Sequence, residues 1–335
     1  MNWADLAAAR LEQIVAPFFS PGTFFSLPQL AVAALVACLY LIFRRKHRGG
    51  LARHAAVVLR AMRGRHLVFN RSTYADLFYF FLNTFVTATL IGWGLFSGLA
   101  VSAWIVRGLH AVFGDVAPSA APDWALRLGV TVIAFLGYEI GYYIDHYLKH
   151  KIPVLWAFHK THHTAEVLTP FTVFRVHPID SLIYTDIVAI CVGLLHGLFT
   201  YWSGKTTAGY VIDNVNVILV VFYFSLAHLQ HSQFWIPFTG PLGRILLSPA
   251  HHQIHHSADP VHYNRNLGSC LAIWDWLFGT LAVPQSRSPS LTFGAPQSGE
   301  DRHAVTVLLI TPFSEAWSLI AARFPAGRSA ETRRA

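Results

Sequence analysis

The chain has 335 residues, of which 54% are hydrophobic and only 13% are charged, and its formal net charge is +8. A soluble domain has about 25% charged residues, and the apolar residues here lie in long runs. A soluble fold is therefore excluded and a membrane protein is indicated. The three cysteines have no Cys-x-x-Cys spacing, which excludes a disulfide framework and a thiolate metal site.

We expect five membrane crossings after an N-terminal amphipathic leader helix. The leader carries Asp5, Arg10 and Glu12 and lacks the basic start of a secretory signal. The second crossing is unusually long and contains several glycines, so it is either tilted or folded back as a hairpin. In chain order, the crossings are predicted at about 28–43, 77–106, 126–144, 182–201 and 211–227.

The basic residues predict the orientation in the membrane. The segment 44–71 carries nine Lys or Arg and no acidic residue, so the positive-inside rule places it in the cytoplasm. On this topology 21 of the 25 basic residues are cytoplasmic, and the net charge reflects topology and attraction to anionic lipid head groups. No basic stretch is interleaved with exposed aromatics, so nucleic acid is not an expected partner.

Ten histidines fall in four groups between residues 146 and 256. The groups are a His-x-x-x-His pair, a His-x-x-His-His triplet, a His-x-x-His pair and a second triplet. Spacings of three and four residues place imidazoles on one face of a helix. Ten nitrogen donors without thiolates suit two transition metals, with iron the obvious candidate. In chain order, the ten are His146, His150, His159, His162, His163, His228, His231, His252, His255 and His256.

Each metal-bound imidazole needs a partner at its second ring nitrogen. His177 and His251 fit a supporting or gating role as well as ligation. Glu139 lies within a crossing, where a carboxylate is costly, so it is either functional or a helix–helix hydrogen-bonding residue. The carboxylates near the histidines are Glu139, Asp145, Glu166, Asp180, Asp259 and Asp275. The histidines interpreted as packing or interfacial residues are His47, His54, His66, His110, His196 and His303.

These motifs resemble the membrane-bound fatty acid hydroxylase and sterol desaturase superfamily, whose pattern is a His-x-x-x-His type pair followed by two His-x-x-His-His triplets. The runs 154–159, 174–178 and 267–280 also resemble family segments, so the resemblance covers roughly residues 130–283. It implies a di-iron centre on the cytoplasmic side of a helical bundle, using dioxygen to hydroxylate or desaturate a lipid. It assigns the ligand and catalytic roles to His146, His150, His159, His162, His163, His231, His252, His255 and His256.

We therefore predict an all-α, polytopic transmembrane bundle with a cytoplasmic helical cap that carries a histidine-rich dimetal site. Residues 1–125 hold the leader, two crossings and the basic loop, residues 126–283 form the catalytic domain, and residues 284–335 form a cytoplasmic tail. The predicted activity is dioxygen-dependent oxidation of a sterol, fatty acyl chain or amino-lipid, with hydroxylation favoured over desaturation. The expected location is a bacterial inner membrane or the endoplasmic reticulum.

The expected cofactors are two iron ions, which zinc can replace in a purified protein. The sequence has no His-Pro-Gly-Gly haem motif, so electrons are expected from an NAD(P)H-linked donor through a separate ferredoxin or b-type cytochrome with its reductase. A histidine-rich metal transporter is the main alternative, although transporters usually place ligands at mid-membrane. A zinc hydrolase is disfavoured because neither triplet contains the glutamate of His-Glu-x-x-His.

Overall fold

The computed structural model describes residues 15–44, 51–62, 64, 67, 69–91, 94–295 and 301–323. The expected leader helix and the basic run 45–48 lie outside these residues. The described part is mostly helical and contains one antiparallel pair of strands, β1 (Val211–Ile212) and β2 (Val215–Asn216). Its helical segments are η1 (Ala16–Phe18), α2 (Leu27–Arg44), α3 (Leu51–Met62), α5 (Arg71–Phe81), the π-helical η2 (Leu82–Thr87), α6 (Ala88–Ile91), α7 (Gly98–Phe113), α8 (Asp123–Lys151), α9 (Pro153–His163), η3 (Thr172–Phe174), α10 (Pro178–Ser203), α11 (Val217–Phe222), the π-helical η4 (Tyr223–Ala227), α12 (His228–Gln230), α13 (Leu242–Ile245), α14 (Pro249–His255), η5 (Pro260–His262), α15 (Ile273–Leu277) and α16 (Val305–Arg323).

Four of the described helices are long and apolar enough to cross a membrane, namely α2, α8, α10 and α16. The first three coincide with the predicted first, third and fourth crossings, so the prediction of a helical membrane protein is confirmed. The fourth, α16, lies in the region predicted as a cytoplasmic tail. An apolar helix at that position was not expected from the sequence.

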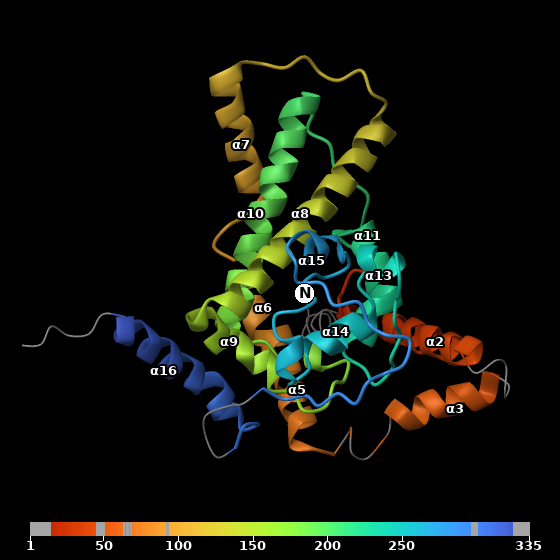
Figure 1. The fold of residues 1–335 in the computed structure, drawn as a ribbon. Coiled ribbons are helices and arrows are strands. Elements are labelled where there is room, and N and C mark those ends of the chain that lie inside the picture. The colour runs from red at the N-terminus through yellow and green to blue at the C-terminus, as the bar shows by residue number, and fades with distance from the viewer. Residues whose placement is uncertain are drawn as a thin grey trace, which may run out of the picture.

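The helices α7, α8 and α10 project together from the rest of the molecule (Figure 1). Glycines lie where their backbones meet. A Cβ atom at Gly137 of α8 would lie 2.8 Å from the Cα atom of Val192, and one at Gly193 of α10 would lie 2.5 Å from the carbonyl oxygen of Gly98. Small residues allow this close approach of helices within a membrane.

The predicted second crossing is wrong as a single continuous helix. Residues 94–97, which precede α7, are not helical, and Gly94 among them has a φ of 64°, which an α-helix does not allow. The N–H groups of Leu95 and Phe96 donate to the carboxylate of Asp186 on α10 at 2.6 and 3.0 Å. Because hydropathy averages over the whole stretch, it does not detect this interruption.

The predicted fifth crossing is also wrong. It begins with the β1–β2 hairpin, whose turn residues Asp213 and Asn214 have φ values of 48° and 63°, as a two-residue hairpin turn requires. The helical segment that follows, Val217–Gln230, is about 21 Å long at the rise of an α-helix. That length is short of the roughly 30 Å hydrocarbon core of a bilayer.

At the base of the bundle, α2 and α3 lie on one side and α16 lies on the other (Figure 1). An apolar core of mostly small side chains joins α2 and α3 to the chain around Leu229.

On the other side, Pro312 of α16 has no N–H and leaves the carbonyl of Leu308 without its helical donor. The hydroxyl of Thr161 on α9 donates to that carbonyl at 3.4 Å. The ion pair Lys160–Glu315, at 2.6 Å, adds to the contact, so α16 supports the helix that carries the first histidine triplet.

Candidate metal centre

The first histidine pair lies at the end of α8 and the first triplet lies on α9. Helix α8 runs to Lys151, and Pro153 then begins α9 at a position where its missing N–H would have no helical partner. Ile152 between them is extended, as a residue before proline prefers. This break turns α9 against the end of α8, and the rings of His146 and His159 come to 4.9 Å between centroids.

The second pair lies around α12 and the second triplet on α14 and the residue that follows it. Ser248 caps α14 in a reciprocal arrangement: its hydroxyl oxygen accepts the N–H of His251 at 3.4 Å, and Nδ1 of His251 accepts the N–H of Ser248 at 3.1 Å. Nε2 of His251 donates to the carbonyl of Gly243 at 3.0 Å. His251 therefore fixes the start of the helix that carries the second triplet.

The structure brings nine of the ten predicted ligands together in two groups. Within each group, one potential ligand atom from every histidine lies within 4.8 Å of the others. The first histidine group consists of His146, His150, His159, His163 and His255. The second histidine group consists of His162, His231, His252 and His256.

Each triplet contributes to both groups. Neighbouring residues of an α-helix are rotated by about 100°, whereas residues four apart differ by only about 40°. Accordingly His159 and His163 belong to the first group and His162 belongs to the second. In the second triplet the arrangement is reversed, because its first and last members belong to the second group and His255 belongs to the first. Each triplet thus contributes two imidazoles to one group and one imidazole to the other group.

The first group presents unpaired nitrogen atoms. Nε2 of each of its five histidines is buried without a hydrogen-bond partner. On the other side of the ring, Nδ1 of His146 lies 2.8 Å from the carbonyl oxygen of Leu267, and Nδ1 of His255 lies 2.9 Å from that of Arg265. A carbonyl only accepts, so these Nδ1 atoms carry the proton and the Nε2 atoms present a lone pair, as metal ligation requires.

Asp180 supports a third imidazole of the first group. Its Oδ2 lies 3.1 Å from Nδ1 of His159. The ammonium group of Lys149 lies between two carboxylates, 2.7 Å from Asp145 and in contact with Asp180. Of the carboxylates considered from the sequence, Asp180 therefore contacts a histidine of the two groups directly, and Asp145 is linked to Asp180 through Lys149.

Asp275 acts on the first group through the backbone. Its carboxylate accepts the N–H groups of Leu267 and Gly268 at 2.7 and 2.8 Å and the hydroxyl of Thr280 at 2.6 Å. These bonds hold the turn whose Leu267 carbonyl contacts His146. Asp275 therefore contacts the histidines only indirectly, through the turn that it holds.

Glu139 and Asp259 also bind backbone groups. The carboxylate of Glu139 accepts the N–H groups of Cys270 and Leu271 at 3.2 and 2.8 Å. Asp259 accepts the N–H of Val261 at 3.1 Å and begins η5. Neither bond reaches a histidine of the two groups. Glu139 thus ties α8 to the loop before α15, which is neither a contact with the histidine groups nor the helix–helix hydrogen bond considered from the sequence.

The nitrogen atoms of the second group are crowded together. Nε2 of His231 lies 2.9, 3.1 and 3.3 Å from the Nε2 atoms of His252, His256 and His162. Burial and neighbouring imidazoles hold the pKa of His162, His252 and His256 well below the usual range and lower that of His231 to about 3. A neutral ring nitrogen makes one hydrogen bond, so hydrogen bonding does not account for all three contacts. Two nitrogens that share a metal at bonds of about 2.0–2.1 Å would lie about 2.8–3.4 Å apart for bond angles of about 90–109°, which matches this spacing.

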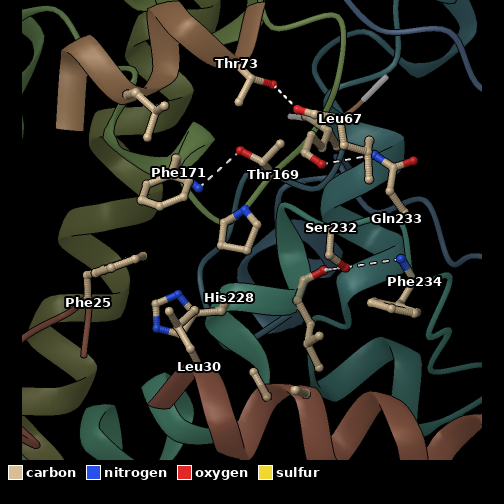
Figure 2. Close-up of a pocket in the computed structure, with 16 residues that line it drawn as sticks. Phe25, Leu30, Leu67, Thr73, Thr169, Phe171, His228, Ser232, Gln233 and Phe234 are labelled. Atoms are coloured by element: carbon tan, nitrogen blue, oxygen red, sulfur yellow. Dashed lines mark hydrogen bonds between the residues drawn. The ribbon is translucent and has the colours of Figure 1, made fainter. Parts of the chain in front are cut away.

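His228, the tenth predicted ligand, lies outside both groups. Its Nε2 lies 3.1 Å from Oε1 of Gln29, and its ring packs edge-on against Phe24 and Phe25 at 5.4 and 5.9 Å. Figure 2 shows His228 in the wall of an apolar cavity of about 220 Å³. The side chains of His228 and His231 reach different surroundings because the backbone of His231 is not helical, with φ −101° and ψ 66°.

His177 also lies outside both groups and caps α10. Its Nδ1 accepts the N–H of Ile179 at 3.1 Å, and its Nε2 donates to the carbonyl of Leu309 at 3.1 Å. Because Leu309 belongs to α16, His177 ties α10 to α16. These bonds favour the supporting role over the ligand role for this residue.

Two further cavities border the histidine groups from different sides. The helix-side cavity, of about 270 Å³, lies among η2, η3, α8, α9 and α10 and is bordered by His146, His159 and His162. The loop-side cavity, of about 540 Å³, is bordered by four other histidines of the groups together with Lys151 and Lys160. Each cavity therefore reaches members of both histidine groups.

Several residues around the groups were not identified from the sequence. The carbonyl groups of Leu267 and Arg265 carry no sequence signal, because any residue supplies a carbonyl. Lys149 did carry a sequence signal, because it follows Asp145 by four residues, which is the spacing of a helical ion pair. Asn83, in the helix-side cavity, lies in the region of the chain without recognisable motifs.

The part of the chain that contains both histidine groups is similar to a known family of proteins. Residues 131–280, which begin within α8 and end just after α15, match the model of the fatty acid hydroxylase family. The chain is 32% identical over 159 residues to alkylglycerol monooxygenase from Danio rerio and 31% identical over 159 residues to that from Homo sapiens. It is 28% identical over 167 residues to human cholesterol 25-hydroxylase. The resemblance to the fatty acid hydroxylase and sterol desaturase superfamily is therefore confirmed, and it lies in residues 131–280.

The similarity covers only part of each protein. The match to the zebrafish alkylglycerol monooxygenase includes 46% of this chain and 30% of the relative, and the match to the human one includes 46% and 31%. The match to cholesterol 25-hydroxylase includes 49% of this chain and 55% of the relative. No solved structure matches the chain.

Proposed function

We propose that this protein is a membrane-bound lipid hydroxylase whose two histidine groups hold two iron ions. One observation carries the proposal. Nine imidazoles, eight of them buried and that of His150 half-buried, form two adjacent groups, with unpaired Nε2 atoms in the first and Nε2 atoms of His231 and its neighbours 2.9–3.3 Å apart in the second. Two iron ions held there would allow dioxygen to oxidise an unactivated C–H bond, which no amino-acid side chain can do.

The chain supplies ligand geometry. In the first group, the carbonyls of Leu267 and Arg265 and the carboxylate of Asp180 hold the Nδ1 protons of three imidazoles. Such partners fix the tautomer and the ring orientation of a metal ligand. We expect Lys149 to balance the charge of Asp180 and Asp145, so that the Asp180 carboxylate stays directed at its histidine.

The helix-side cavity is the proposed site of the reacting lipid carbon. It is bordered by α8 and α10, two of the candidate membrane spans, and by histidines of both groups. Phe174 in its wall packs 5.7 Å from Phe25, which borders the apolar cavity of Figure 2. That apolar cavity is larger than the roughly 150 Å³ needed to bind benzene, so it offers space for part of a hydrocarbon chain.

The loop-side cavity is the proposed side of electron delivery. It reaches the histidines from a face that carries Lys151 and Lys160. Following the positive-inside rule, we place this face in the cytoplasm, where a separate ferredoxin or b-type cytochrome would supply electrons. The names of the relatives, a monooxygenase and a hydroxylase, favour hydroxylation over desaturation and a lipid as the substrate.

The proposal is tested by expressing the chain and two histidine variants in cells grown under isotopically labelled dioxygen. His162→Ala removes a member of the second group, and His110→Ala removes a histidine outside both groups as a matched control. Iron in the purified proteins and oxygen in the extracted lipids are measured by mass spectrometry. We expect a lipid carrying one labelled oxygen with the wild type and with His110→Ala only. The same product from His162→Ala, or oxygen derived from water, would contradict the proposal.

A further inference from the structure

Two aromatic rings lie between the helix-side cavity and the apolar cavity. Phe174 borders the first of these cavities and Phe25 borders the second. The two rings meet edge-on at 5.7 Å between centroids. Phe171, which also borders the apolar cavity, lies 5.1 Å from Phe25, and Figure 2 shows both on the same side of that cavity. At this point the two cavities are therefore separated by aromatic side chains.

The backbone that carries Phe174 is anchored by one buried carboxylate. Phe174 ends η3, and the guanidinium of the next residue, Arg175, lies 3.1 Å from Oδ1 of Asp76 on α5. Oδ2 of Asp76 accepts the hydroxyl of Thr172, at the start of η3, at 2.7 Å. Breaking a buried ion pair is strongly destabilising. A passage between the cavities would therefore open by rotation of the rings and not by movement of this backbone.

A third ring holds the first two in contact. Phe80 on α5 packs edge-on against Phe174 at 4.9 Å and lies 5.1 Å from Phe25. It borders neither cavity. Edge-to-face pairs of aromatic rings are favourable beyond the area that they bury. The closed arrangement of Phe174 and Phe25 is thus stabilised from the side.

We infer that Phe174 determines the length of the hydrocarbon chain that the site accepts, because its ring closes the helix-side cavity towards the apolar cavity. A chain that occupies both cavities has to displace this ring. The inference rests on the proposed function and adds a specificity-determining residue to it.

The cavity volumes set the expected length. A cavity of about 150 Å³ holds a benzene molecule, so one of about 270 Å³ has room for roughly ten carbons. Without the ring of Phe174, the chain could extend into the apolar cavity of about 220 Å³.

The test measures binding and requires neither dioxygen nor turnover. The purified full chain in detergent is titrated with 1-octanol, 1-dodecanol and 1-hexadecanol. Affinity is read from the shift of the thermal unfolding midpoint. It is expressed per mole fraction of alkanol in the micelle, which removes the preference of longer chains for the detergent.

Three variants are compared with the wild type. Phe174→Ala removes the ring between the cavities. Phe80→Ala is the matched control, because it truncates a phenylalanine of the same cluster that borders neither cavity. The double variant Phe174→Ala, Ala34→Phe removes the ring and fills the apolar cavity from α2, since Ala34 borders that cavity.

We expect the affinity of the wild type to rise from octanol to dodecanol and to level off at hexadecanol. We expect Phe174→Ala to bind hexadecanol about tenfold more tightly than dodecanol, because filling cavity volume with apolar groups is favourable. Phe80→Ala is expected to follow the wild type. The double variant is expected to lose the preference for hexadecanol.

Four results would overturn the inference. Phe174→Ala would level off as the wild type does, Phe80→Ala would gain the same preference for hexadecanol, or the double variant would keep that preference. A wild-type affinity that continues to rise to hexadecanol would overturn it even if no variant folded.

The outcome is independent of the test of the proposed function. If no lipid gains oxygen from dioxygen but Phe174→Ala acquires the preference for hexadecanol, the hydroxylase proposal fails and the role of Phe174 stands. If a lipid gains labelled oxygen but Phe174→Ala keeps the chain-length profile of the wild type, the hydroxylase proposal stands and the role of Phe174 fails.

Discussion

His228 and His231 lie three residues apart, and the structure gives them different surroundings. His231 has its Nε2 atom 2.9–3.3 Å from those of three other histidines, whereas His228 pairs with Gln29. We therefore expect His231→Ala to lose one of two bound metal ions and His228→Ala to keep both. The two variants are matched controls for each other in residue type and burial.

The size of the effect follows from the number of ligands. Sites with four protein ligands bind zinc with about 10–16 kcal/mol, so one ligand of four contributes roughly 3 kcal/mol, which is about a hundredfold in dissociation constant. The assay is metal content by mass spectrometry after dialysis against a chelator set to retain both ions in the wild type. Two ions retained in His231→Ala, or one lost in His228→Ala, would refute the assignment of the second group.

Three further predictions concern the surroundings of the groups. Asp180→Asn is expected to weaken metal binding at the first group 10- to 100-fold, roughly the effect of losing such a partner, while Asp186→Asn on the same helix leaves it unchanged; competition with a chelator measures both. Asp76→Asn leaves the fully buried Arg175 without its ion-pair partner and is expected to cost about 3–5 kcal/mol; an unchanged unfolding midpoint would contradict this. A cysteine replacing Arg53 is expected to react with an impermeant reagent only from the cytoplasmic side, and labelling from outside would refute the topology.

The histidine spacing predicted that the groups form, and helical geometry explains how they divide. Because His162 and His163 are adjacent, they point about 100° apart and serve different groups. The sequence therefore predicts that the histidines of one triplet divide between two groups. It does not predict which histidines of the two triplets share a group, since that depends on how α9 and α14 are packed.

The errors in the predicted crossings have a common physical cause. Hydropathy measures the preference of a segment for an apolar surrounding, and it is nearly insensitive to the backbone conformation of single residues. Gly94, with a positive φ, and the turn at Asp213 and Asn214 each interrupt an apolar stretch that would otherwise be long enough to span. These three residue types are typical of turns, so the signal was present in the sequence but was outweighed by the apolar average.

The segment 267–280 resembles the family without contributing a histidine, and the structure gives the reason. Asp275 binds the N–H groups of Leu267 and Gly268, and the carbonyl of Leu267 in turn contacts Nδ1 of His146. A carboxylate is needed because it accepts two backbone N–H groups and the Thr280 hydroxyl at once. The residues that shape the first histidine group thus extend well beyond the histidines, through bonds that no spacing rule between side chains predicts.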